Sequence, residues 1–300
     1  MSPSPQFDHL LSKAEHERLW ARVQSQFVWQ QDESTPLLLN GLPLGYVNEK
    51  WRQLVRQDWP GAWRESAAGL LLEAENWLAM ADGLQNMAQG WSRVGLLDGW
   101  RNEKFDVTDD KGQVLFALER AAFRPFGLLS NAIHINGLAF VGGEWKFWIG
   151  RRSPYKAVDP NKLDNLVGGG VASGESIREA MLREGGEEAG LTEAQLQNAR
   201  CCGRRLSMRN VSRGLHRENL HIFDVVLPEG VLPENQDGEV AEFMLLDAGS
   251  LAQAMGEGRL MNDAFLATLD AFRRYGLLDE AHSLSRWLAA PDCGAEAYLR

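Results

Sequence analysis

The sequence lacks an excess of positive charge. It has 31 lysines and arginines against 41 aspartates and glutamates, a formal net charge of −10 over 300 residues. A chain of this sign has no general attraction for nucleic acid or for anionic membranes, so we expect neither as a partner. A polyanionic ligand would need positive groups gathered locally, or a bound metal ion.

Cysteine and targeting signals are also scarce. Cys201 and Cys202 are adjacent and Cys293 is distant, a spacing that suits reduced, buried core thiols better than disulfides or a zinc site. The N-terminal stretch MSPSPQFDHLLSKAEHERLW has no cationic leader before an apolar core, and no apolar run reaches eighteen residues. We therefore expect a cytoplasmic protein.

The length favours two domains. Residues 1–125 predict a smaller α+β domain, with helical spacing over 10–26, a strand at GLPLGYV and a helix at NEKWRQLVRQ. KFDVT and QVLFALER, joined by DDKG, predict a β-hairpin that ends this domain.

Residues 126–300 predict a larger α/β domain. Five strand-like runs surround one helix predicted from Glu175 to Ala189, and a helical tail follows, with a helix capped by Asn262 and closed at Gly276. The runs are AIHINGLAFVG, WKFWIGRR, CCGRRLSM, NLHIFDVVL and AEFMLL. Strands on both sides of a central helix indicate a sandwich with a mixed sheet.

The stretch REGGEEAGL, which begins at Arg183, carries the chemistry. On a helix Glu184, Glu187 and Glu188 share one face, because they lie three and four residues apart. Such a cluster repels itself unless it binds a cation, and carboxylate oxygens are preferred ligands of Mg²⁺. Arg183 is placed to pair with Glu175 or another carboxylate and hold the array still.

Glycines inside and before this helix need an explanation, since each helical glycine costs about 1 kcal/mol relative to alanine. We interpret Gly185 and Gly186 as positions where another backbone approaches the helix closely. Upstream, LVGGGVASG includes Gly169 and Gly170, whose backbone amides can contact a diphosphate. A solvated acidic helix face is the alternative, and the joint spacing described next disfavours it.

The full pattern is Gly169, five residues, Glu175, seven residues, then Arg183 through Gly190. It resembles the Nudix box, except that Gly185 stands where that family has a hydrophobic residue. The resemblance implies an α/β/α sandwich and an Mg²⁺- or Mn²⁺-dependent hydrolase of diphosphates.

The Nudix resemblance also implies roles for residues. The catalytic set is Arg183, Glu184, Glu187 and Glu188, with Glu184 or Glu187 as the base that deprotonates the attacking water. The metal ligands are the three glutamates, the carbonyl of Gly168 and one acidic residue from outside the box, for which Glu239 and Glu218 are candidates.

A narrower resemblance rests on the stretches WIGRRSPYKAVDPNKLDNLVGGG, DGEVAEF and ERAAFRPFGLLSNAIHING. Over roughly residues 100–250 these are similar to the Nudix subfamily associated with thiamin pyrophosphokinase, whose members carry an extra N-terminal domain. That resemblance implies an accessory specificity domain and cleavage of thiamin diphosphate, or its oxidised analogues, to the monophosphate. An aromatic pocket would suit the ring.

Several further residues are candidates for contacting the substrate. His134 could equally be a hydrogen-bonded structural histidine, and Arg205 and Arg209 could also reach phosphate. The expected substrate contacts are Arg151, Arg152, Lys156, His134, Gly169 and Gly170.

Three alternatives stay open. One is a Nudix hydrolase of another nucleoside-diphosphate-type substrate. A second is an isopentenyl diphosphate isomerase, whose family pattern places a reactive cysteine before the box, where this chain has none. The third is a non-catalytic Nudix module, which often loses box glutamates that this chain retains. In each case we expect a small-molecule organic diphosphate as ligand, and a monomer or homodimer.

Overall fold

The computed structural model describes residues 5–27, 29, 31–156 and 158–290. Its helices are α1 (Lys13–Gln26), α2 (Glu49–Asp58), α3 (Trp77–Arg93), α4 (Phe123–Phe126), α5 (Ile177–Ala189), α6 (Glu193–Leu196), α7 (Ala248–Gly256), α8 (Asn262–Arg274) and α9 (Ser283–Ala289), with 3-10 turns η1 (Gln31–Glu33) and η2 (Arg120–Ala122). Its strands are β1 (Thr35–Leu39), β2 (Leu42–Val47), β3 (Trp63–Ser66), β4 (Gly69–Leu72), β5 (Lys104–Thr108), β6 (Val114–Glu119), β7 (Ser130–Val141), β8 (Glu144–Arg152), β9 (Leu163–Asp164), β10 (Val167–Gly170), β11 (Cys201–Val211), β12 (Gly214–Val226) and β13 (Val240–Leu246).

A mixed seven-stranded sheet is the centre of the larger unit. Five strands lie in the order β11-β12-β7-β8-β13, while β10 pairs with β7 and β9 with β8. The β12–β7 pair is parallel and the other pairs are antiparallel. The predicted mixed α/β class is confirmed.

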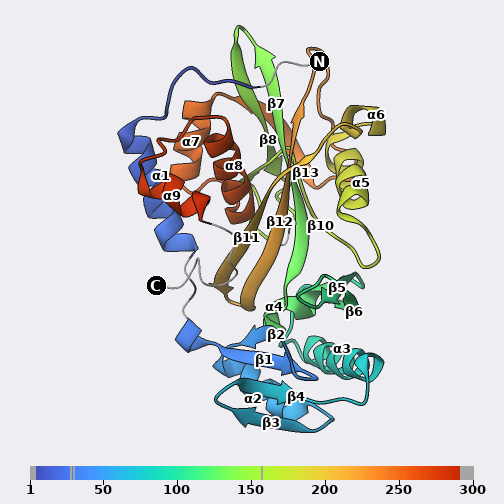
Figure 1. Ribbon diagram of the computed structural model, residues 1–300. Helices are drawn as coiled ribbons and strands as arrows, with labels where there is room; N and C mark the ends of the chain where they lie inside the picture. The colour runs from blue at the N-terminus through green and yellow to red at the C-terminus, as the bar shows by residue number, and fades with distance from the viewer. Residues whose placement is uncertain (1–4, 28, 30, 157, 291–300) are drawn as a thin grey trace.

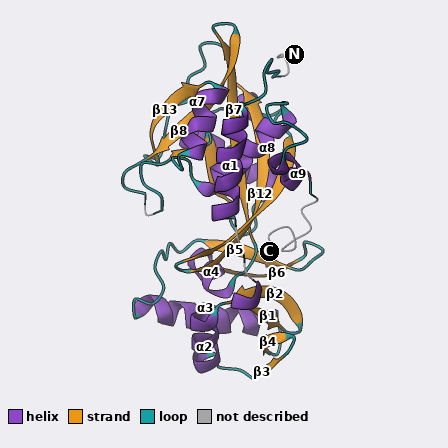
Figure 2. Cartoon of the chain, turned by 90° about the vertical axis from the view of Figure 1, so that its left-hand side faces the viewer, coloured by secondary structure: helices purple, strands orange, loops and turns teal. Residues whose placement is uncertain are grey.

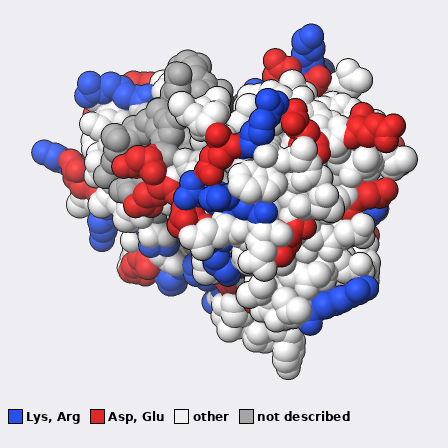
Figure 3. Space-filling view, turned by 90° about the horizontal axis from the view of Figure 1, so that it is seen from below, with Lys and Arg blue, Asp and Glu red and all other residues white. Residues whose placement is uncertain are grey.

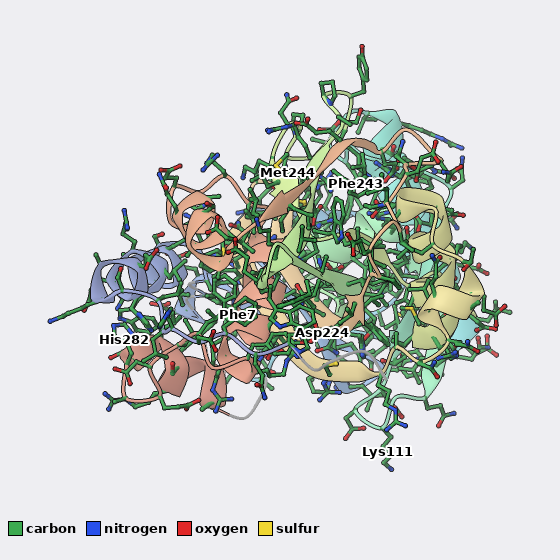
Figure 4. The ribbon with its side chains drawn as sticks, turned by 90° about the horizontal axis from the view of Figure 1, so that it is seen from above. Phe7, Lys111, Asp224, Phe243, Met244 and His282 are labelled. Carbon is green, nitrogen blue, oxygen red and sulfur yellow. The ribbon has the colours of Figure 1, made fainter. Side chains whose placement is uncertain are left out.

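Helices cover both faces of this sheet. The cluster that includes residues of α1, α7, α8 and α9 packs on one face, and the cluster that includes residues of α5 and α6 packs on the other (Figure 1). Adjacent residues of β13 show the alternation of faces: Met244 packs against the first cluster and Phe243 against the second (Figure 4).

The smaller unit lies below the larger one (Figure 2). It has a four-stranded sheet in the order β2-β1-β4-β3, the helices α2 and α3, and the hairpin β5–β6, around its own core. Helix α1 is not part of that core, because Leu19 and Val23 are buried with residues of α7, α8 and α9. The division at residue 125 stays a proposal, and residues at the start of the chain pack across it.

The surface carries mixed charge. The face seen from below shows acidic and basic side chains interspersed among wide uncharged areas (Figure 3). In the described part of the chain, no helix is both long enough and apolar enough to cross a bilayer.

Three details differ from the sequence-based expectations. Cys201 and Cys202 are exposed rather than buried, because they begin β11 at the edge of the sheet beside a register shift, and Cys293 lies outside the described residues. Asn262 is the first residue of α8 and Met261 is its N-cap. Helix α3 occupies a Gly- and Trp-rich segment for which no helix was predicted.

Candidate active site

Helix α5 has well-formed ends. The Ser176 hydroxyl accepts a hydrogen bond from the Glu179 amide, and the Glu179 carboxylate accepts one from the Ser176 amide, a capping box that fixes the first turn. The helix stops at Gly190, whose φ of 63° is left-handed and whose amide donates to the Gly186 carbonyl. The last box glycine therefore ends the helix that carries the glutamates.

Arg183 organises the acidic face of α5. Its Nε and Nη2 donate to the two carboxylate oxygens of Glu175 at 2.8 and 2.9 Å, a bidentate pair. Its Nη1 donates to Glu184 at 2.8 Å and to Glu187 at 3.2 Å, and Nη2 also reaches the Gly170 carbonyl at 3.2 Å. The hydrogen bonds to Glu175 raise the pKa of Arg183 above its ordinary value, although burial opposes this.

Gly169 is required by the position of Glu184. A Cβ atom built on Gly169 would lie 2.1 Å from the carboxyl carbon of Glu184, so any larger residue must displace that carboxylate. Burial raises the pKa of Glu184, and the hydrogen bond from Arg183 opposes that shift.

Glu188 is the most enclosed of the box glutamates. Its carboxylate accepts a hydrogen bond from the Gly168 amide at 2.9 Å and lies 3.9 Å from the Lys156 ammonium. Burial, with the negative charge of Asp164, raises the pKa of Glu188 to about 8. By contrast, the side chain of Glu187 is 51% exposed.

Lys156 connects the box to the expected outside ligand. Its ammonium contacts the carboxylate of Glu239 as well as approaching Glu188, so the two carboxylates lie on either side of one cation. Burial lowers the pKa of Lys156. The structure thus brings Glu239 to the box through a lysine.

The donor set at this end fits a hard divalent cation. Carboxylate oxygens of Glu184, Glu187, Glu188 and Glu239 with the Gly168 carbonyl are ligands of the kind Mg²⁺ takes, and two protein cations already hold the carboxylates in place. In this structure, however, these carboxylate oxygens do not lie close together as a group. Within the described ranges, ligand atoms of three His, Cys, Asp or Glu residues come within 4.8 Å of one another only at a cluster elsewhere.

That other cluster contains the second outside candidate, Glu218. It accepts from Ser130 Oγ at 2.7 Å and lies beside His216 and Asp263. In the sheet Glu218 pairs with Ser130, whereas Gly168 pairs with His134, four residues further along β7. Four residues of strand span roughly 13 Å, so the structure does not bring Glu218 to the box carboxylates.

One cavity of about 320 Å³ joins these two clusters. The box end contributes Glu184, Glu187 and Glu239, and the far end contributes His216 and Glu218. A volume in this range accommodates a small organic ligand.

The hairpin β5–β6 of the smaller unit forms one wall of the cavity. Asp106 accepts from Ser173 Oγ at 2.6 Å and from the Gly174 amide at 3.0 Å, in the loop that leads into α5. Phe105 lines the cavity and touches Gly170, where an added Cβ would lie 2.5 Å from the ring. At the hairpin turn Lys111 points outward at the edge of the molecule (Figure 4). No sequence pattern predicted the long-range contact between the hairpin and the loop that leads into α5.

The remaining predicted residues divide into two groups. Arg152 lines the cavity and pairs with Asp164 at 2.7 Å, and His134 lines it while its Nδ1 lies 2.9 Å from the Asn165 amide oxygen. Arg151 pairs with Glu242 and is not among the lining residues.

Arg205 and Arg209, the two further candidates for contacting phosphate, differ in their position relative to the cavity. Arg205 binds Asp270 and does not line the cavity, whereas Arg209 lines it and binds Asp263 at 2.7 and 3.1 Å. The guanidinium of Arg209 is thus already engaged by a carboxylate.

The two helical glycines have different surroundings from those expected. At Gly185 a Cβ would lie 2.5 Å from the end of the Leu196 side chain, so a side chain and not a backbone makes the close approach. At Gly186 the nearest atom to such a Cβ is the Leu191 carbonyl oxygen at 3.8 Å. The interpretation of close backbone contact is wrong for Gly185, and Gly186 has ordinary space.

Comparison with known proteins supports the resemblance of this segment to the Nudix box. Residues 133–264 match the model of the NUDIX domain. Two relatives from Arabidopsis thaliana, Nudix hydrolase 24 and Nudix hydrolase 20, both chloroplastic, are 36% and 33% identical over 61% of this chain. These matches cover 51% and 50% of the relatives, so the chain spans about half their length. The crystal structure of DR0079 from Deinococcus radiodurans is 22% identical over 55% of this chain and 98% of its own, with a TM-score of 0.42.

Proposed function

We propose that this protein is a metal-dependent Nudix hydrolase that cleaves the P–O–P bridge of a small organic diphosphate. The observation that carries the proposal is the arrangement on α5, where one arginine holds Glu175, Glu184 and Glu187 beside a glycine-lined cavity. A solvated acidic helix face would not need one arginine to pair with three glutamates in this way.

The proposed mechanism assigns tasks to residues of the chain. Glu184, Glu187, Glu188 and Glu239, with the Gly168 carbonyl, would hold Mg²⁺ or Mn²⁺, which supplies Lewis-acid stabilisation of charge at phosphorus and makes bound water more acidic. Arg183 keeps the carboxylates in position through its pair with Glu175.

A glutamate then takes the proton of the attacking water. Glu187 is accessible and Glu184 is enclosed, with its pKa raised by burial, so each has one property of a general base. Gly169 and Gly170 line the cavity, where their backbone would contact the diphosphate.

The narrower proposal, from the subfamily resemblance, is that the substrate is thiamin diphosphate or an oxidised analogue, cleaved to the monophosphate. Phe105 and Phe123 line the cavity and offer rings for a heterocycle to stack on. The arginines that line the same cavity favour an analogue whose ring carries no positive charge.

A product assay tests both levels. The panel comprises thiamin diphosphate, its oxidised forms, ADP-ribose, NADH, nucleoside triphosphates and isopentenyl diphosphate, each with Mg²⁺, with Mn²⁺ and with a chelator. Monophosphate from thiamin-type substrates alone would support the narrow proposal, and cleavage across the panel would support only the general one. Isomerised product, or binding without turnover of any compound, would overturn it.

Location and assembly are part of the proposal as well. We propose a cytoplasmic enzyme that acts as a monomer or homodimer, although the two plant relatives are chloroplastic by name. Fractionation of cells that contain the tagged protein and light scattering of the purified protein test these points.

A further inference from the structure

At the end of the cavity away from the box, several guanidinium groups form no ion pair with a described carboxylate. In the described part of the chain, four lining arginines form no ion pair with a carboxylate within 4 Å: Arg101, Arg124, Arg213 and Arg217. The other lining cations, among them Arg120, Arg152 and Lys156, each have such a partner.

Arg124 is the clearest example of a lining arginine that forms no ion pair. Its Nη2 lies 3.0 Å from Nδ1 of His216, and the pKa of that histidine is lowered by burial and by the charge of Arg209, so the ring is a neutral acceptor. The other ring nitrogen faces Asp263 at 3.2 Å, and Asp263 already binds Arg209 in a bidentate pair. Burial lowers the pKa of Arg124 to about 10, as expected for a guanidinium without a full counter-ion.

Arg213 lies beside Arg124 at the contact between the two units. The Trp51 indole donates to the Arg213 carbonyl at 2.9 Å. Next to Arg213, an added Cβ at Gly214 would lie 2.2 Å from the Arg124 carbonyl oxygen, so the backbones of Arg124 and Arg213 are close together. Arg217 differs, because its guanidinium donates to the Leu44 carbonyl at 3.0 Å and lies over the Tyr46 ring.

Arg124 and Arg213 are the unpaired cations at this end. Of the two carboxylates that act on Arg124, Asp263 is already paired with Arg209, and Glu218 forms no ion pair with an arginine among the described residues. A metal ion at the His216, Glu218 and Asp263 cluster is disfavoured, because Arg209 already neutralises Asp263 and Arg124 adds charge next to the histidine. An anion would supply the counter-charge that Arg124 and Arg213 lack within the chain.

We propose that this arginine end of the cavity binds an oxyanion group, a carboxylate or a phosphate, located at the end of the substrate remote from the diphosphate. The proposal deepens the proposed function, on which it rests for the identity of the site. Guanidinium groups bind such groups through bidentate, charge-assisted hydrogen bonds. A thiamin-type substrate has no acidic group there, so the two narrow proposals predict different substrates.

Anion binding can be measured without turnover. The metal-free protein, kept in chelator, is titrated with inorganic phosphate and with acetate by calorimetry, in parallel for wild type, Arg213→Gln and Arg124→Lys. We expect phosphate to bind wild type and to bind Arg213→Gln about tenfold more weakly or worse. Arg64→Gln is the matched control, because Arg64 is exposed on the smaller unit and should leave binding unchanged.

Arg124→Lys keeps one charge but loses the planar fork, and it guards against misfolding of a larger change. Phosphate affinity equal to wild type in both variants, or no binding to wild type at millimolar concentrations, would overturn the proposal. Weaker binding in both variants but not in Arg64→Gln would support it.

Turnover separates this proposal from the proposed function. Coenzyme A and dephospho-coenzyme A both contain a diphosphate and differ in one phosphate remote from it. We expect a lower KM for the phosphorylated member in wild type and no such difference in Arg213→Gln. Equal KM values in wild type would remove the arginine subsite and leave the hydrolase intact. Phosphate binding with no hydrolysis of any diphosphate would remove the hydrolase and leave the subsite.

Discussion

The two ends of the cavity differ in whether their charged groups form ion pairs within the chain. At the box end the carboxylates are paired with cations from the chain itself, Arg183 and Lys156. At the arginine end the guanidinium groups of Arg124 and Arg213 form no ion pair with any described carboxylate. Ion pairs within the chain hold the groups of the box end in position, whereas a ligand would supply the counter-charge at the arginine end.

Removing a carboxylate from the box end should have the largest effect on turnover. Glu187→Gln and Glu188→Gln each keep the shape and lose the charge, so we expect kcat/KM to fall by about 100-fold or more while the thermal unfolding curve persists. Glu193→Gln, an exposed glutamate on α6, is the matched control. Wild-type rates in both box variants would contradict the assignment of this end.

A smaller loss is expected when position, and not charge, is disturbed at the same end. In Gly169→Ala the new methyl group displaces the Glu184 carboxylate, and we expect turnover to fall about 10- to 100-fold, a loss typical of disturbed support around a metal ligand. Steady-state kinetics and a melting curve measure the effect. Gly90→Ala serves as control, since a Cβ there meets no atom within 4 Å, and equal activity of the two variants would show that Glu184 tolerates displacement.

The pH dependence of stability sharpens the contrast without any ligand. In the folded metal-free protein, burial raises the pKa of the Glu188 carboxyl to about 8 from its ordinary value of 4.5. Between these values the unfolded chain binds fewer protons, so this group's contribution to the free energy of unfolding falls as pH rises.

Melting temperatures of chelated wild type and Glu188→Gln at pH 5 and pH 8 check this. We expect wild type to lose more stability than the variant over that interval. Identical losses would mean that the enclosed carboxyl ionises normally.

The smallest effect concerns the helix under the box end. Gly186→Ala should raise the free energy of unfolding by roughly 0.5–1 kcal/mol, because the added methyl meets only ordinary contact and alanine favours the helix. Gly185→Ala should be less stable than Gly186→Ala, since its methyl group must displace the end of Leu196. Denaturant unfolding of the pair measures the difference, and the reverse order would refute the packing argument.

Local patterns predicted the local features of this molecule. The 3.6-residue period and the box spacing place Glu184, Glu187 and Glu188 on one helix, and alternating residues around DDKG predict the β5–β6 hairpin. The bounds of α5 lie within two residues of the predicted start and agree at Ala189.

Contacts between distant segments could not be predicted in this way. Arg124 and His216 meet across 92 residues, and Asp106 and Ser173 across 67, with no periodicity to record either contact. The exposure of Cys201 follows from an edge position in the sheet, which no property of the cysteine itself reveals. The arginine end of the cavity is therefore a product of tertiary structure alone.

The hairpin wall has a consequence for how specificity can change. Asp106 and Phe105 belong to a segment that precedes residues 133–264, yet they touch the glycine loop in front of α5. Exchange of the segment 104–119 for that of a related chain would change this wall of the cavity and leave every box residue in place. Under the proposed function, substrate preference and hydrolysis would thus depend on separate stretches of one polypeptide.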